Sequence, residues 1–216
     1  QSACGAGTYA ESDGATNCEL CASGTYQTEP GKSKCEACTP GGYCVLGAAS
    51  VTLCPAGTYS NTVGATNDAT CLDTPPGYYS TEGAATATEC GGPSLFCPGG
   101  EGSPRSVSDG YETFTDAALD GAPADADDTS TRTSQRSCAD GVTCVAGLGV
   151  PCKIGSYCVA GEEFLCPAGV VGEAEKLTTA ACSRPCPRGA YCAAGSTAPQ
   201  LCPAGKYGAV EGLTHA

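Results

Sequence analysis

The stretch CPAGTYSNTVGATNDATC, residues 54–71, holds the pattern that decides the fold. It opens with Cys-x-x-Gly-x-Tyr and ends on a second cysteine. The opening pattern returns along the chain, beginning at Cys4, Cys21, Cys38, Cys54, Cys152, Cys186 and Cys202. Self-similarity at a short period is typical of a tandem repeat. We therefore expect an array of short modules.

The position of the second cysteine separates two types of module. In the long type it lies 14 to 17 residues after the opening cysteine, and in the short type it lies six residues after it. The long modules run over Cys4–Cys18, Cys21–Cys35, Cys54–Cys71 and Cys166–Cys182. The short modules run over Cys38–Cys44, Cys138–Cys144, Cys152–Cys158 and Cys186–Cys192.

Some copies have lost cysteines. Thr74 stands where an opening cysteine is expected, and we interpret Cys90 as the residue that closes its module. The next short module keeps Cys97 but no opening cysteine. Val107 and Gln135 occupy the two positions of a third, fully lost pair. Loss in pairs is what disulfides predict, because a leftover thiol is reactive in an oxidising compartment.

Pairing neighbouring cysteines in chain order uses every cysteine but Cys202. The predicted disulfides are Cys4–Cys18, Cys21–Cys35, Cys38–Cys44, Cys54–Cys71, Cys90–Cys97, Cys138–Cys144, Cys152–Cys158, Cys166–Cys182 and Cys186–Cys192. Cys202 opens a module whose closing cysteine would fall past Ala216, so we expect the repeat to continue. An interleaved scheme such as Cys186–Cys202 stays open, because a sequence alone does not fix connectivity.

The composition agrees with cross-linked modules. The 216 residues include 19 cysteines, 31 glycines, three Phe and no Trp. Such a chain lacks the large side chains of an ordinary core, so covalent links must replace one. Disulfides at this density indicate an oxidising, extracellular location. A net charge of −13 argues against a nucleic-acid partner, and no apolar run is long enough to span a bilayer.

These observations predict a small disulfide-rich fold: an elongated tandem array of irregular and β-hairpin modules with little or no helix. At most one helical turn is expected, at residues 117–119. Each motif glycine supplies a turn with positive φ, and each tyrosine is expected to lie over a disulfide. Units this small should contact mainly their neighbours and form a rod. We expect residues 1–97 as one repeat block, 98–137 as an acidic linker or expanded degenerate repeat, and 138–216 as a second block with a truncated last module.

The run from Cys54 to Cys71, with Gly64-Ala65-Thr66 inside it, resembles the ephrin-receptor-like cysteine-rich repeat, a relative of tumour necrosis factor receptor modules. The runs beginning at Cys186 and Cys202 resemble the long tandem versions in surface proteins of protists and algae, which include flagellar-hair (mastigoneme) components. The resemblance implies an extracellular rod with disulfides between neighbouring cysteines, at the cell or flagellar surface. It is specific for the repeat class and weak for function, because such repeats serve receptors, adhesins and filaments alike.

Two kinds of metal site are alternatives to the disulfide interpretation. No cofactor is expected, and calcium on the acidic segment is kept as an alternative, although the aspartates lack the order of an EF-hand. The aspartates are Asp109, Asp116, Asp120, Asp125, Asp127 and Asp128. The Cys-x-x-Cys pairs, Cys18 with Cys21 and Cys35 with Cys38, have spacing close to a zinc ribbon. We interpret them as module boundaries, because the compartment favours disulfides.

An enzyme is not expected, because the one histidine, His215, has no neighbouring acid to orient it. The first hypothesis is a structural subunit of an extracellular filament, flagellar hair or cell coat that self-associates. The alternative is the stalk or ligand-binding ectodomain of a receptor or adhesin. Expected partners are copies of itself or other extracellular proteins. O-linked glycans stay open, whereas N-linked ones are not expected, because no Asn-x-Ser/Thr sequon occurs.

Overall fold

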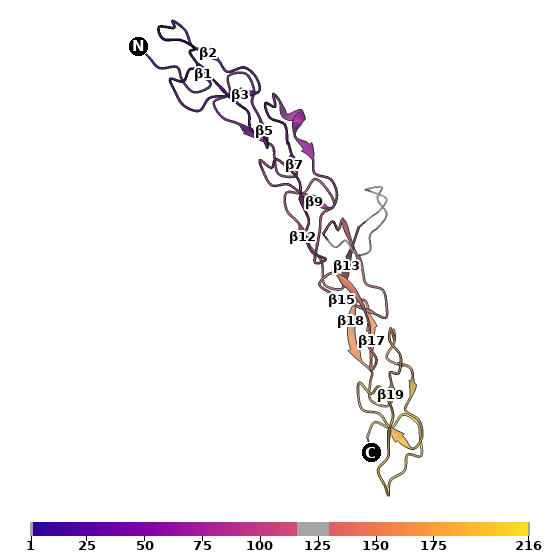
Figure 1. Ribbon diagram of the computed structural model, residues 1–216. Coiled ribbons are helices and arrows are strands. Elements are labelled where there is room, and N and C mark those ends of the chain that lie inside the picture. Colours follow the sequence, from indigo (N-terminus) through magenta and orange to yellow (C-terminus); the bar gives the residue numbers. More distant parts are fainter. Residues whose placement is uncertain (1, 116–129, 216) are drawn as a thin grey trace. The chain divides into compact units, whose positions relative to one another are not determined.

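The structure, a computed structural model, describes residues 2–115 and 130–215 (Figure 1). Contacts between residues divide the chain into two units. Unit one comprises Gln1–Arg105 and Thr115–Ser134, and unit two comprises Ser106–Phe114 and Gln135–Ala216. The helical turn expected at residues 117–119 lies outside the described residues.

The described chain is built from two-stranded hairpins, and Figure 1 labels several of their strands. The first six are β1 (Thr8–Tyr9) with β2 (Glu19–Leu20), β3 (Thr25–Tyr26) with β4 (Glu36–Ala37), β5 (Gly42–Tyr43) with β6 (Thr52–Leu53), β7 (Thr58–Tyr59) with β8 (Leu72–Asp73), β9 (Tyr78–Tyr79) with β10 (Thr88–Glu89), and β11 (Leu95–Phe96) with β12 (Arg105–Ser106). A single 3₁₀ turn, η1 (Asp68–Thr70), lies between β7 and β8.

The remaining hairpins contain some longer strands. They are β13 (Tyr111–Phe114) with β14 (Ser134–Ser137), β15 (Val142–Val145) with β16 (Leu148–Pro151), β17 (Ser156–Val159) with β18 (Glu162–Leu165), β19 (Val170–Val171) with β20 (Arg184–Pro185), and β21 (Ala190–Tyr191) with β22 (Gln200–Leu201). Over residues 2–115 and 130–215 the structure contains no α-helix. The predicted class, small disulfide-rich hairpin modules with little or no helix, is confirmed.

One hydrogen bond recurs in the hairpins and defines where each module begins. The carbonyl of the motif glycine accepts the N–H of the residue that opens the next module, as Gly7 does from Cys21 at 2.9 Å. We number modules 1 to 12 by their opening residues, which are Cys4, Cys21, Cys38, Cys54, Thr74, Cys90, Val107, Cys138, Cys152, Cys166, Cys186 and Cys202.

Consecutive modules are joined by a ladder of backbone hydrogen bonds. Each module has a spacer residue in its second half, usually a glycine with positive φ, such as Gly47. Three bonds join a module to the next, and they recur through most of the array. Between modules 2 and 3 they run from Gly24 N–H to Cys44 C=O (2.8 Å), from Gln27 N–H to Ala48 C=O (3.1 Å), and from Gly47 N–H to Cys21 C=O (2.7 Å).

The ladder explains three residues with unusual backbone. Ala146, Ala160 and Lys176 have φ of 51°, 51° and 58°, in the left-handed region that disfavours side chains. All three occupy the spacer position of their modules, where the following residue accepts a ladder bond. Lys176 also donates the spacer bond itself, to Cys152 at 2.8 Å. The stacking therefore holds this position left-handed even without glycine.

The motif glycines also bring in the module after next. A Cβ added to Gly24 in module 2 would lie 2.5 Å from the carbonyl oxygen of Gly64 in module 4, and one added to Gly155 would lie 2.6 Å from that of Gly195. A side chain there would exclude the approaching backbone. The expectation that a module contacts mainly its neighbours is thus incomplete, because motif glycines such as Gly24 and Gly155 also approach the module after next.

Disulfides and small residues form the buried core. Tyr26 of module 2 packs against the Cys38–Cys44 disulfide and Ala48 of module 3. Val171 takes the place of the tyrosine in module 10 and is fully buried with the cysteines of module 11. The prediction that the motif aromatic lies over a disulfide is thus confirmed for Tyr26, and the disulfide belongs to the next module.

The ladder corrects the interpretation of Cys90. Its N–H donates to Gly77 C=O at 2.9 Å, which is the bond of an opening residue, so Cys90 opens module 6 and does not close module 5. Module 5 therefore has neither cysteine. Thr74 opens it, is 2 % exposed, and donates its hydroxyl to Gly57 C=O at 2.8 Å.

We predict that Gly57→Ala destabilises unit one more than Gly100→Ala does. Both positions have positive φ (87° and 66°), so alanine costs about 1–2 kcal/mol at either. Only at Gly57 would the new Cβ meet the carbonyl oxygen of the other glycine, and forcing the backbones apart adds about 1–3 kcal/mol. Hydrogen exchange of the ladder amides in modules 4 to 6 measures the difference. Equal loss of protection in the two variants would contradict the stacking role.

Candidate functional site

Nine disulfides join the cysteines of the described chain, with Cα atoms 5.6 to 6.3 Å apart. This separation is within the range that an unforced disulfide spans. The pairs are Cys4–Cys18, Cys21–Cys35, Cys38–Cys44, Cys54–Cys71, Cys90–Cys97, Cys138–Cys144, Cys152–Cys158, Cys166–Cys182 and Cys186–Cys192. They are the pairs of the neighbour scheme, and Cys202 is a half-buried free thiol.

The Cys-x-x-Cys pairs have no free thiols in this arrangement. Cys18 and Cys21 belong to disulfides of different modules, and so do Cys35 and Cys38. In the part of the chain that the structure describes, no three His, Cys, Asp or Glu residues are grouped to hold a metal ion.

Most aspartates of the calcium alternative lie outside the described part of the chain. Five of its aspartates, Asp116, Asp120, Asp125, Asp127 and Asp128, lie outside the described residues. Asp109 is described and lies on the surface, beside the motif glycine of module 7. Calcium binding therefore stays a prediction.

His215 lies at the surface of module 12. Its Nδ1 shares a hydrogen bond of 2.8 Å with the hydroxyl of Thr214. It borders a hollow of about 380 Å³ together with Cys202, Tyr207 and Leu213, and none of the lining residues carries a carboxylate. The hollow thus lacks the acid that would orient a catalytic histidine.

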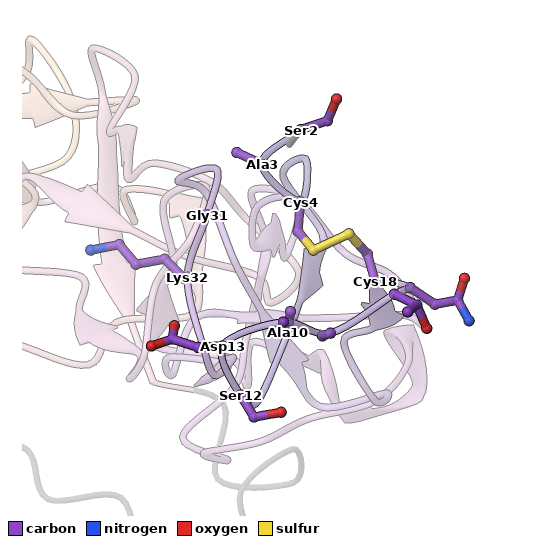
Figure 2. Close-up of a pocket in the computed structure, with 13 residues that line it drawn as sticks. Ser2, Ala3, Cys4, Ala10, Ser12, Asp13, Cys18, Gly31 and Lys32 are labelled. Carbon is purple, nitrogen blue, oxygen red and sulfur yellow. A yellow bond between two sulfur atoms is a disulfide. The ribbon is translucent and has the colours of Figure 1, made fainter.

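A second, larger hollow lies at the start of unit one, and sequence reasoning missed it (Figure 2). It measures about 790 Å³ and is bordered by the Cys4–Cys18 disulfide, Ala10, Ser12 and Lys32. Ligand pockets are mostly apolar with a few convergent polar groups. This hollow is instead bordered mostly by small and polar residues, so it lacks the apolar lining of a typical ligand pocket.

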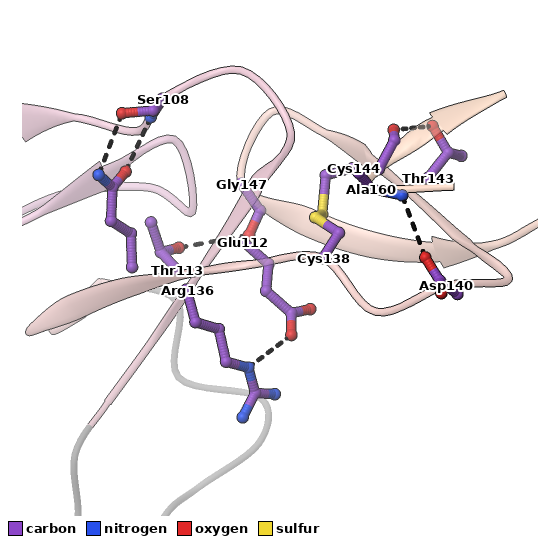
Figure 3. The surroundings of a disulfide bond; sticks show 12 residues. Ser108, Glu112, Thr113, Arg136, Cys138, Asp140, Thr143, Cys144, Gly147 and Ala160 are labelled. Atoms are coloured by element: carbon purple, nitrogen blue, oxygen red, sulfur yellow. Dashed lines mark hydrogen bonds and ion pairs between the residues drawn. A yellow bond between two sulfur atoms is a disulfide. The ribbon is translucent and has the colours of Figure 1, made fainter. Parts of the chain in front are cut away.

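Module 7 replaces its lost disulfide with hydrogen bonds (Figure 3). Gln135, at the closing position, accepts the Ser108 N–H with its side-chain oxygen at 2.8 Å and bonds the Ser108 hydroxyl with its amide nitrogen at 3.0 Å. Ser108 follows Val107, the opening residue, so the clasp lies where the disulfide would be. The described ends of residues 98–137 are thus folded, and the predicted boundaries of this segment stay a prediction.

Charged groups reinforce single hairpins. Arg136 pairs with Glu112 at 2.7 Å and lies over the Phe114 ring, 5.2 Å from its centroid. Hydrogen bonding to Arg184 lowers the pKa of Glu173, and a hydrogen bond to Glu19 raises the pKa of Tyr9. These groups are exposed, so each pair contributes little to stability. Each of these pairs joins two parts of one hairpin, and the pairs do not converge on a common site.

The comparisons with known proteins agree with the repeat class. A family described as tyrosine-protein kinase ephrin type A/B receptor-like matches residues 7–51, which cover most of modules 1 to 3. No curated protein matches the chain. Among the described residues there is no helix of the length and apolar character needed to cross a membrane. The disulfides and the receptor-like repeat fit an extracellular protein with a structural or receptor-like role.

We predict that peptide mapping links Cys38 to Cys44. Chymotrypsin cuts after Tyr43 and Leu53, which separates Cys38, Cys44 and Cys54 onto different fragments of the unreduced protein. Mass spectrometry should find Cys38 joined to the fragment that holds Cys44. A link from Cys38 to Cys54 would overturn the neighbour scheme.

We also predict that module 5 accepts a tenth disulfide. Ala87 lies three residues before Cys90, as Cys18 lies before Cys21, so Thr74→Cys with Ala87→Cys should pair. Closing a loop of about 14 residues should stabilise the module by about 3 kcal/mol. Thiol titration should count one thiol in the double variant, from Cys202, and two in the control Ala87→Cys. Three thiols in the double variant would show that module 5 lacks the geometry of the long modules.

Proposed function

We propose that this protein is a structural subunit of an extracellular filament or cell coat, such as a flagellar hair, and that it self-associates. The observation that carries the proposal is the backbone ladder, in which most modules bind the next through the same backbone groups. Interactions of this kind depend on backbone geometry more than on side chains. They suit a material built by repetition.

The surface chemistry supports a structural role over catalysis. The buried positions of the described chain are mostly cysteines and small residues, and the charged groups are spread over the hairpins. The larger hollow is polar, and the hollow at His215 has no carboxylate. We therefore propose a protein that is not an enzyme and needs no organic cofactor. Its partners are copies of itself or other extracellular proteins, with O-linked glycans on its surface hydroxyls.

The second candidate is a receptor or adhesin ectodomain. The family match over residues 7–51 favours it, because that family is described by a receptor. In this case the modules would serve as a stalk or present a ligand-binding face. Self-association distinguishes the two candidates, since a stalk holds one chain at a membrane whereas a filament subunit must bind its own kind.

Electron microscopy and sedimentation velocity of the secreted, oxidised protein test the proposal. We expect particles that grow with protein concentration in the micromolar range, because each subunit binds others. The same protein with its disulfides reduced and alkylated is the control and should not assemble. A single monomeric species at all concentrations would overturn the filament role and leave the receptor candidate.

A further inference from the structure

We infer that strand β18 (Glu162–Leu165) of one chain pairs with β18 of a second copy, antiparallel and across a two-fold axis. The inference rests on the proposed function and deepens it by naming a surface through which subunits associate. It concerns module 9, which has modules of unit two on both sides. It follows from the backbone groups and side chains that β18 leaves without a partner.

Module 9 is a more regular hairpin than most of the others. Its strands β17 and β18 have four residues each, whereas the strands of modules 1 to 6 have two. Val159 pairs with Glu162 across a turn of two residues, Ala160 and Gly161, whose φ angles are 51° and 83°. Positive φ at both positions is typical of the type I′ turn, which matches the twist of the flanking strands. The hairpin therefore has a regular outer edge.

The outer edge of β18 carries backbone groups without a partner. Cys158 N–H points away from β18 and donates to Leu177 C=O at 2.8 Å. Glu163 lies opposite Cys158 in the hairpin, so the N–H and C=O of Glu163 point away from β17. The same holds for Leu165, two residues further along the strand. Among residues 2–115 and 130–215, no hydrogen-bond partner for these groups occurs.

The side chains of β18 are exposed as well. All four residues of the strand are exposed, and two of them are apolar. Phe164 is 42 % exposed and Leu165 is 65 % exposed. Phe164 stacks on Tyr157 with the ring centroids 5.5 Å apart, so one face of its ring is covered within the module. An exposed strand edge with apolar side chains is a template for pairing with another strand.

The preceding hairpin shows how such an edge is closed. In module 8, β13 lies beside β16, and Thr113 N–H donates to Gly147 C=O at 2.8 Å. The last residue of β16 is Pro151, which has no N–H. Proline at an edge prevents the pairing of a further strand. At the equivalent position β18 has Leu165, which retains its N–H.

The outward groups fix the register of the pair. Glu163 N–H donates to Leu165 C=O of the second chain, and Leu165 N–H of the second chain donates to Glu163 C=O. The two-fold axis repeats both bonds with the chains exchanged. The axis passes beside Phe164, so the two Phe164 side chains lie opposite each other and extend the stack on Tyr157. Such an isologous contact joins chains in pairs, and growth of a filament uses a further surface.

The charges at this edge suit a second copy in this register. Glu163 faces Leu165 of the second chain, so the two Glu163 carboxylates are not directly opposite each other. Lys153 pairs with Glu163 of its own chain at 3.5 Å and offsets the negative charge at the edge. Covering Phe164 and Leu165 removes apolar surface from water, which favours association. The occupant that matches the edge in length, register and charge is thus β18 itself.

Hydrogen exchange of the oxidised chain at low and high protein concentration tests the pairing. All chains carry Cys202→Ser, so that this thiol forms no disulfide between chains. The Glu163 and Leu165 amides should exchange about tenfold more slowly, or slower still, where the parent assembles than in the dilute monomer. Gly149 holds the position of Glu163 on β16 and is the internal control, so its exchange should not change. Equal slowing at Gly149 would overturn the assignment to β18.

A proline variant tests the role of the backbone edge. Leu165→Pro removes the outward N–H and leaves the bonds between β17 and β18 in place. Pro151 and Pro185 occupy the equivalent position in modules 8 and 10, so the fold is retained. Leu165→Ala is the matched control, because both variants lose the leucine side chain and only the first loses the N–H. The Glu163 amide should lose its concentration-dependent protection with Leu165→Pro and keep most of it with Leu165→Ala. The Cys158 amide, bonded to Leu177 C=O, reports that module 9 is folded.

A cysteine at the axis tests that the occupant is a second copy. With Phe164→Cys, the thiols of two chains lie opposite each other, and oxidation should join them into a covalent dimer. Val150→Cys is the control, because Val150 is 43 % exposed on β16 and Phe164 is 42 % exposed on β18. Adding Leu165→Pro to Phe164→Cys should reduce the yield of dimer about tenfold. Equal yields of dimer from the two cysteine variants would contradict the contact through β18.

The failures of the two proposals are distinguishable. If the parent assembles while the Glu163 and Leu165 amides exchange as in the monomer, subunits join through another surface. The β18 contact is then wrong while self-association stands. If the parent is monomeric at every concentration, both the β18 contact and the filament role are wrong.

Discussion

The close approach of one backbone to the motif glycine of an earlier module is the constraint on which the stacking depends. At Gly24 and Gly155 the carbonyl of the module after next occupies the space that a Cβ would need. The same glycine donates one ladder bond and accepts the bond that closes its hairpin. Because glycine has no side chain, three segments of the chain can meet at this one residue. No large apolar core is required, because the backbones satisfy each other's hydrogen bonds.

Disulfides cross-link most of the stacked modules. The two modules that lack a disulfide show what the cross-link contributes. Module 5 has Thr74 at its opening position, and its hydroxyl bonds the carbonyl of Gly57. Module 7 has Gln135, which clasps Ser108 from the position of the closing cysteine. Both modules keep their place in the ladder. The cross-link thus stabilises a module against unfolding, while the stacking geometry is set by the backbone.

Backbone contacts that recur from module to module support a structural function based on repetition. The charged pairs join parts of single hairpins, and most modules contact the next through the same backbone groups.

The sequence by itself determined the module type, and it predicted the pairing of neighbouring cysteines and an oxidising compartment. These follow from local spacing. The Cys-x-x-Gly-x-Tyr pattern formed by Cys54, Gly57 and Tyr59 recurs along the chain, and neighbouring cysteines are close in sequence. The sequence misassigned Cys90, because its distance from Cys97 is one residue longer than in the other short modules, and only the hydrogen bond to Gly77 identifies it as an opening residue. The tertiary structure alone decided that Gly24 contacts module 4 and that Ala146 and Ala160 are left-handed. Such contacts join residues about 40 positions apart through backbone atoms, which are alike in every residue and leave no pattern of side chains to read.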